Sequence, residues 1–171
     1  VLRAVDVSGR STRELPLADA REAAFDPEGK TLWFTRYGLQ VSGDNAQDYR
    51  GGAMAQLWRW SGNEAEEAQR IAPDLDANLS TPMWWNGRLY AVSDAGGRAN
   101  LWSMASDGSE RRALTTHRGF DVRGADMDRG RIVYQLGADL RLFDSADGSD
   151  RALAIDVGSD FGLRRTRYLK Q

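Results

Sequence analysis

The chain contains one histidine, His117, within the segment Leu-Thr-Thr-His-Arg-Gly-Phe. A histidine can act as a general base because its ordinary pKa lies near neutral pH. Hydrolysis by a serine triad would also need a nucleophile on a strained turn such as Gly-x-Ser-x-Gly, and the sequence has no such motif. We therefore expect a structural role for His117 and assign no catalytic residue to this chain.

Carboxylates that are close in sequence occur at Asp74 and Asp76, at Asp126 and Asp128, and at Asp107 and Glu110. A glycosidase places two carboxyl groups about 5 to 10 Å apart across a sugar, and calcium needs about six to eight oxygen ligands. Proximity in sequence supplies neither arrangement, and Asp-Gly at 107–108 is typical of a hairpin tip. The sequence predicts no metal site and no cofactor.

A second candidate is the segment Tyr49-Arg50-Gly51-Gly52, which ends a long insertion over residues 38–55. Paired glycines allow the backbone to approach a ligand or another strand closely, and long loops in compact domains are often functional. These four residues are candidate contacts to a peptide or to a neighbouring domain. Arg164 and Arg165 are candidates of the same kind, because guanidinium groups pair well with carboxylates. The alternatives are a purely structural loop and a solvated, linker-like tail.

Composition limits the function classes. Lys and Arg number 23 against 25 Asp and Glu, and this near balance argues against a nucleic-acid partner, which needs clustered basic residues. The absence of cysteine excludes disulfides, thiolate nucleophiles and cysteine zinc sites. No run of about 18 apolar residues is present, so no membrane span is expected. A length of 171 residues is typical of one domain.

The candidate residues belong to a repeat. A short alternating strand followed by a polar turn begins at each of four leucines, Leu2, Leu57, Leu101 and Leu140. An aliphatic residue stands 13 or 14 positions after each of these leucines, at Leu15, Ile71, Leu114 and Leu153. Turn signals rich in Asp, Asn and Gly at 26–30, 86–88 and 128–131 each lead into another apolar run. Such residues between apolar runs are hairpin signals, since they tolerate positive φ.

The repeat period is 44 residues from Leu57 to Leu101 and 39 from Leu101 to Leu140. A period near 40 with four short strands predicts an all-β fold, a β-propeller of four-stranded antiparallel blades. The chain then holds an incomplete segment of about three and a half blades. We expect one partial propeller with approximate units 2–56, 57–100, 101–139 and an incomplete 140–157, and a linker-like tail at 158–171. We expect tryptophans to pack between the blades and open blade edges to drive self-association.

The motif "AAFDPEGKTLWFT" resembles the propeller repeat of TolB and its relatives. Three further stretches, "YRGG" followed by "LWRW", "RLYAVSDAGGRANLWSMASDGSERRALT" and "IDVGSDFGLRRTRYLK", resemble in that order the N-terminal six-bladed propeller of tricorn-type proteases. The resemblance covers the chain from about residue 5 to residue 170.

The resemblance implies a non-catalytic channel, gating or scaffold segment of a serine protease that degrades oligopeptides. Its implied partners are the remaining blades, downstream protease domains and a peptide substrate or product. The resemblance favours the cytoplasm, and a periplasmic location stays open. The alternatives are a TolB-like propeller that docks a partner protein, and the propeller of a prolyl-oligopeptidase-type hydrolase.

Overall fold

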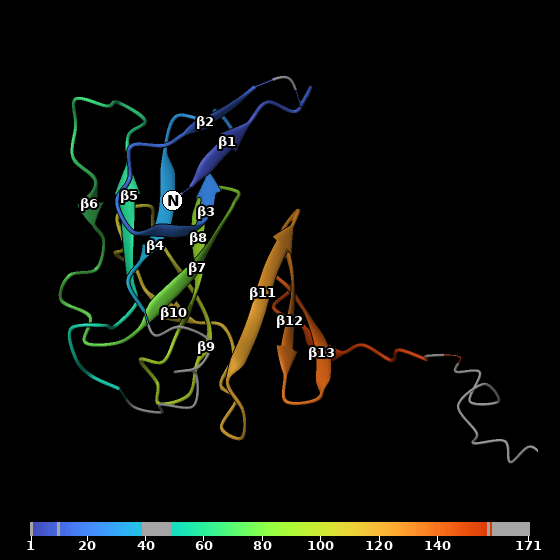
Figure 1. The fold of residues 1–171 in the computed structure, drawn as a ribbon. Coiled ribbons are helices and arrows are strands. Elements are labelled where there is room, and N and C mark those ends of the chain that lie inside the picture. Colours follow the sequence, from blue (N-terminus) through green and yellow to red (C-terminus); the bar gives the residue numbers. More distant parts are fainter. Residues whose placement is uncertain (1, 10, 39–48, 157, 159–171) are drawn as a thin grey trace, which may run out of the picture.

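The computed structural model describes residues 2–9, 11–38, 49–156 and 158, and these form strands and turns without a helix. Three four-stranded antiparallel sheets follow one another along the chain, preceded by a two-stranded hairpin (Figure 1). Within each sheet the strands are in chain order. No described segment is a helix that could cross a membrane. The all-β propeller prediction is confirmed, and two strands plus three blades make about three and a half blades.

The hairpin consists of β1 (Arg3–Val5) and β2 (Thr12–Glu14). Blade I consists of β3 (Ala20–Phe25), β4 (Leu32–Arg36), β5 (Gln56–Trp60) and β6 (Gln69–Arg70). Blade II consists of β7 (Leu79–Trp85), β8 (Arg88–Ser93), β9 (Asn100–Met104) and β10 (Arg112–Ala113). Blade III consists of β11 (Val122–Asp128), β12 (Arg131–Leu136), β13 (Asp139–Asp144) and β14 (Asp150–Ala152).

Two hairpins turn through the residue pairs expected from the sequence. Asn86 and Gly87 have φ of 47° and 77° between β7 and β8, and Arg129 and Gly130 have φ of 47° and 80° between β11 and β12. Positive φ at both central residues matches the right-handed twist of the flanking strands. The turn chemistry thus explains why blades II and III each start with a tight hairpin.

The leucine and aliphatic positions of the repeat are joined by a backbone hydrogen bond. The later residue donates its N–H to the carbonyl of the leucine at 2.8 to 3.0 Å, in the pairs Leu15 to Leu2, Ile71 to Leu57, Leu114 to Leu101 and Leu153 to Leu140. In blades I to III the leucine lies in the third strand and its partner directly follows the fourth. The β1–β2 hairpin therefore corresponds to the outer two strands of a further blade.

The repeat units are consequently out of phase with the sheets. Units 57–100 and 101–139 each join the outer strands of one blade to the inner strands of the next, and 140–157 completes blade III. The half blade among the described residues is the N-terminal hairpin and not the segment 140–157. Alternation locates strands, whereas hydrogen-bond pairing decides which four strands share a sheet.

Adjacent blades bury apolar side chains against each other. Between blades I and II lie Trp33, Leu57, Ile71, Leu79, Leu89, Ala91 and Met104, with Trp84 and Trp102 packed against them. Between blades II and III lie Met83, Tyr90, Val92, Leu101, Val122, Ile132, Tyr134 and Phe143. Leu15, Leu32, Phe34 and Trp60 fill the space between blade I and the hairpin. The large rings act as packing, as the sequence predicted.

The innermost strand of every blade carries a bulge. The register shifts between Arg21 and Ala23 in β3, between Ser80 and Met83 in β7, and between Arg123 and Asp126 in β11. Each shift contains a residue with positive φ: Glu22 at 44°, Thr81 at 54° and Gly124 at 55°. Bulges increase local twist and bend a strand, so the repeated bulge shapes the inner edge of the propeller in the same way three times.

Candidate functional site

The strongest site candidates gather at one end of the blades. Because strands alternate in direction, the connection between the second and third strands lies at the same end as the connection to the next blade. The loop ending in Tyr49 to Gly52 is the second-to-third connection of blade I. His117 lies in the connection from blade II to blade III. We call this the loop end of the segment.

Residues 49–54 form a compact turn. The Met54 N–H donates to the Gly51 carbonyl at 3.1 Å, and the Ala53 N–H donates to the Tyr49 hydroxyl at 3.3 Å. A Cβ on Gly51 would lie 2.5 Å from the Tyr49 hydroxyl oxygen, while nothing lies within 4 Å of a Cβ on Gly52. The close approach expected for the glycine pair is therefore made at Gly51, by the Tyr49 ring of the same loop.

Arg50 links this turn to blade II. Its Nη1 donates to Asp94 Oδ2 at 2.9 Å, and the Arg50 side chain is 32% exposed whereas that of Asp94 is 14% exposed. Asp94 also accepts the backbone N–H and the side-chain amide of Asn78, both at 2.8 Å. Asn78 in turn accepts the Ala55 N–H on its Oδ1 at 2.9 Å. Arg50 thus supports a contact between two blades.

The same arrangement recurs one blade later. Asp121 Oδ1 accepts the Ala99 N–H at 2.9 Å, and Arg98 lies 3.7 Å from Asp121 Oδ2. Asn78 and Asp121 both directly precede the innermost strand of the following blade. The roles of Asn78, Asp94 and Asp121 were not expected from the sequence, although the spacing of an alanine and a later Asn or Asp was present there as a signal.

His117 belongs to a polar cluster inside blades II and III. Its Nε2 lies 2.9 Å from the Tyr134 hydroxyl oxygen and 3.3 Å from Asp150 Oδ2. Tyr134 donates its hydroxyl hydrogen to Asp150 Oδ1 at 2.8 Å, and Arg141 Nε donates to the same oxygen at 3.0 Å. The Tyr134 hydroxyl donates its only hydrogen to Asp150. The hydrogen bond between His117 and Tyr134 therefore needs a hydrogen on His117 Nε2, which donates to the Tyr134 hydroxyl oxygen.

The main chain of His117 is held as firmly as its ring. Its N–H donates to Asn100 Oδ1 at 2.7 Å and its carbonyl accepts from Asn100 Nδ2 at 3.1 Å. Thr115 donates its hydroxyl to the same Asn100 oxygen at 2.9 Å. These bonds fix the connection between blades II and III, so the structural role expected for His117 is what the geometry favours.

Burial dominates the electrostatics of the cluster. It lowers the pKa of His117, partly opposed by the attraction of Asp150 and reinforced by the nearby Arg141 charge. Burial and the hydrogen bond to Asp150 raise the pKa of the Tyr134 hydroxyl well above its usual value. At neutral pH both groups are therefore uncharged beside the Arg141–Asp150 ion pair.

The carboxylate pairs are used in turns and surface ion pairs. Asp74 accepts two hydrogen bonds from Arg111 at 2.9 and 2.6 Å, and these hold the pKa of Asp74 below its usual value. Glu110 pairs with Arg88 at 2.8 Å, and Asp107 accepts the N–H of Ser109 at 2.9 Å in a hairpin turn. In the part of the chain that the structure describes, no three His, Asp or Glu residues are grouped to hold a metal ion.

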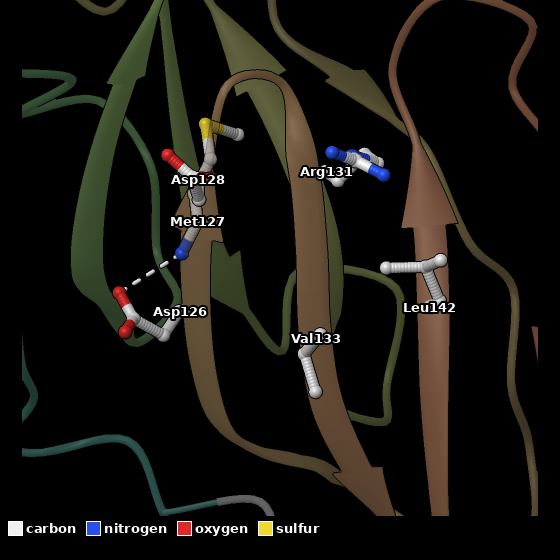
Figure 2. Close-up of a pocket in the computed structure, with 6 residues that line it drawn as sticks. All are labelled: Asp126, Met127, Asp128, Arg131, Val133 and Leu142. Atoms are coloured by element: carbon white, nitrogen blue, oxygen red, sulfur yellow. Dashed lines mark hydrogen bonds between the residues drawn. The ribbon is translucent and has the colours of Figure 1, made fainter. Parts of the chain in front are cut away.

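An open pocket of about 310 Å³ lies away from the loop end, on the free face of blade III. It is lined by Asp126, Met127, Asp128, Arg131, Val133 and Leu142. Figure 2 shows Val133 on β12 and Leu142 on β13 as neighbours on this face, and their Cα atoms are register partners. The lining is part apolar and part charged, and it lies where a following blade would pack.

Comparison with known proteins decides the family. The sequence-family model described as the tricorn protease N-terminal beta propeller domain matches residues 1–149 of the chain. The chain belongs to this family. A tricorn protease homologue of Streptomyces coelicolor is 37% identical over 164 residues, which cover 94% of the chain and 13% of that relative. A tricorn protease homologue of Saccharolobus solfataricus is 30% identical over 73% of the chain and 12% of its own length.

Solved structures agree on the fold. The crystal structure of the tricorn protease superposes with a TM-score of 0.75 at 22% identity, covering 92% of the tricorn-family chain and 15% of that protein. A TolB structure from Agrobacterium tumefaciens superposes with a TM-score of 0.59 at 12% identity, covering 82% and 50%. The chain therefore spans a small part of the length of its tricorn relatives. The resemblances to the tricorn propeller and to TolB are both confirmed at the level of fold.

Proposed function

We propose that this segment is a non-catalytic channel or scaffold part of the propeller in a tricorn-like serine protease that degrades oligopeptides. The observation that carries the proposal is the match of the tricorn N-terminal propeller family over residues 1–149. Because the chain corresponds to 13% of a tricorn homologue, the rest of such a protein has ample room for the hydrolytic site. Its partners are the remaining blades and the protease domains.

The environment of His117 supports a non-catalytic role. A general base needs a nucleophile within hydrogen-bond reach, whereas Nε2 of His117 faces the Tyr134 hydroxyl and Asp150. Arg141 holds Asp150 through a hydrogen bond, and packing between blades II and III holds Tyr134. The His117 ring contacts Tyr134 on β12 and Asp150 on β14, and it thereby connects the loop after blade II to strands of blade III. Such contacts support a scaffold role.

The loop end is the part of the segment that we propose contacts a peptide or a neighbouring domain. Tyr49 and Arg50 begin the turn that Gly51 and Gly52 close, and this turn is tied to blade II through Asp94. A loop held in this way presents a defined surface at little cost in conformational entropy. The other proposed contacts, Arg164 and Arg165, lie outside the described residues.

The proposal is tested by labelling the full-length protein with a fluorophosphonate that reacts with active-site serines. We expect hydrolysis of fluorogenic oligopeptides and a label that maps outside residues 1–171. The His117→Gln variant should keep its kcat, because its ring touches no reacting atom. A label within residues 1–171 would overturn the non-catalytic role. A full-length protein that neither reacts nor hydrolyses peptides, but captures a partner protein, would favour the TolB-like alternative.

A further inference from the structure

The hairpin between β7 and β8 carries the one Asn-Gly pair of the chain, Asn86-Gly87. Asparagine is among the chemically labile residues, because the backbone nitrogen of the next residue can attack the carbon of its side-chain amide. Glycine in second place favours this attack, since it has no side chain to crowd the nitrogen and lets the backbone rotate. The other asparagines precede alanine, glutamate or leucine. Asn86 is therefore the asparagine whose sequence best suits an intramolecular reaction.

Both reacting groups of this pair are free in the described structure. Asn86 and Gly87 are exposed at the tip of the hairpin. The side-chain amide of Asn86 and the N–H of Gly87 form no hydrogen bond with any described residue. Nothing lies within 4 Å of a Cβ built on Gly87, so the space beside its nitrogen is open. The two groups can therefore approach each other without either giving up a hydrogen bond.

The remaining described asparagines are held away from this reaction. Asn63 Nδ2 donates to Glu66 at 3.0 Å, and Asn78 Nδ2 donates to Asp94 at 2.8 Å. Asn100 uses its side-chain nitrogen and oxygen to hold the connection between blades II and III. An amide engaged in this way must break its hydrogen bonds before its carbon can meet the next backbone nitrogen. The structure and the sequence thus select the same asparagine.

Two Asp-Gly pairs provide an internal comparison, because an aspartate side chain can close the same ring. In both pairs the glycine N–H donates to a backbone carbonyl a few residues earlier, at 2.9 Å in Asp107-Gly108 and at 2.8 Å in Asp147-Gly148. Hydrogen bonds from Ser109 and Ser149 also lower the pKa of the two aspartates, and an ionised carboxylate resists attack by a nucleophile. The folded chain therefore suppresses ring closure at both Asp-Gly turns.

We propose that Asn86 is a modification site at which the folded protein deamidates itself. The Gly87 nitrogen forms a bond to Asn86 Cγ, its proton passes through water to Nδ2, and the Cγ–Nδ2 bond breaks to release ammonia. Water then opens the cyclic imide. Opening at Cγ leaves aspartate, whereas opening at the main-chain carbonyl leaves isoaspartate, in which the backbone runs through the former side chain. The net reaction consumes one water and releases one ammonia, and it needs no other reactant.

Isoaspartate changes this hairpin more than aspartate does. It adds a carbon to the main chain of a two-residue turn whose flanking residues, Trp85 and Arg88, are directly paired. The longer backbone no longer has the paired positive φ values that match the twist of the strands. Arg88 donates to Glu110 Oε2 at 2.8 Å, and a new carboxylate two residues away competes for this guanidinium. Deamidation therefore loosens the hairpin that opens blade II.

The first test incubates the folded full-length protein and maps residue 86 by peptide mass spectrometry, with an isoaspartate-specific methyltransferase to identify that product. We expect aspartate and isoaspartate at residue 86, with a rate that rises about tenfold per pH unit because the fraction of deprotonated Gly87 nitrogen does so. Asn86→Gly is the matched control, since it keeps a residue that accepts positive φ and lacks the amide. An Asn86 that stays intact while the urea-unfolded protein deamidates there would overturn the proposal.

The second test uses the Asp-Gly pairs as reporters of the hydrogen-bond argument. Isoaspartate should be absent at Asp107 and Asp147 in the folded protein and should appear at both in urea, where the glycine N–H groups are released. Folded protein that forms isoaspartate at Asp107 or Asp147 as fast as at residue 86 would overturn the argument that a free N–H selects the site.

The third test concerns the consequence for the hairpin. Aged wild type should unfold at a lower temperature than fresh wild type, whereas Asn86→Gly should not change with age. Freshly prepared Asn86→Asp, which adds the charge without the extra carbon, should lie between fresh and aged wild type. Equal unfolding temperatures of fresh and aged wild type would overturn the loosening of blade II. Serine labelling is unaffected by any of these outcomes, so this inference and the proposed function fail separately.

Discussion

Gly87 and Gly130 occupy the same position in two equivalent hairpin turns, with φ of 77° and 80°. An alanine at either position carries the left-handed backbone penalty of about 1–2 kcal/mol. Only at Gly130 would the added Cβ also meet neighbours, at 2.6 Å from both Ser145 Oγ and Trp85 Nε1. Gly130 thus has a packing role between blades II and III that Gly87 does not have.

We expect Gly130→Ala to lower the free energy of unfolding by about 1–3 kcal/mol more than Gly87→Ala, because overpacking adds to the shared backbone penalty. Urea denaturation of the two variants measures the difference. Equal losses would mean that Trp85 moves aside freely.

At His117 the prediction concerns pH. Its pKa is lower in the folded chain than its ordinary value of about 6.5, since burial disfavours the charged ring. The unfolded chain therefore binds the proton first as pH falls. The stability contributed by the neutral ring is present above about pH 6.5 and is lost as pH falls through the folded pKa.

Replacing the ring by an uncharged amide in His117→Gln should remove this part of the pH dependence while Asp150, Arg141 and Tyr134 remain. The free energies of unfolding of wild type and variant, measured from pH 7.5 to 5.0, should converge toward acid pH. Parallel curves over this range would contradict the burial argument.

At the scale of elements, the interface between blades I and II is centred on two aromatic rings. Trp33 of β4 stacks on Trp84 of β7 with centroids 4.3 Å apart, and Trp33 Nε1 donates to the Ser106 carbonyl at 3.0 Å. Trp33 is 2% exposed, whereas Trp85, the next residue along β7 from Trp84, is 39% exposed. Alternation along the strand sends Trp84 and Trp85 to opposite faces, as the sequence predicted.

We expect Trp33→Ala to cost about 3–5 kcal/mol of unfolding free energy, the usual cost of deleting a buried aromatic ring. Trp85→Ala is the control and should cost less than half as much. Thermal or urea unfolding monitored by circular dichroism compares them. A smaller loss at Trp33 than at Trp85 would show that the stack contributes little to the interface.

At the scale of the whole molecule, the described segment ends in an open blade face that holds Val133 and Leu140. Exposed apolar patches of this kind promote association. Residues 1–171 alone should therefore self-associate at micromolar concentration, and the Val133→Lys and Leu140→Lys double variant should be less associated. Ala95→Lys with Ala146→Lys, at exposed turns away from this face, is the control. Light scattering that gives equal masses for all three would place the association elsewhere.

The sequence by itself determined the fold class and the family. Leucine spacing near 40 residues, the Asn-Gly and Arg-Gly turns and the alternating tryptophans depend on local chemistry, and local chemistry is readable along the chain. The same patterns indicated that His117 and the carboxylate pairs would serve the structure. The spacing of Ala55 to Asn78 and Ala99 to Asp121 was also present in the sequence, but its meaning required the hydrogen bonds.

Only the tertiary structure decided the phase of the blades and the partners of the long loop. Every strand of a repeat has two edges, and pairing across space decides which neighbour it takes, so the half blade was located at β1–β2 by hydrogen bonds. Arg50 meets Asp94, 44 residues away, and His117 meets Asp150 across three strands of blade III. Such contacts depend on how sheets stack, which no short window of sequence contains.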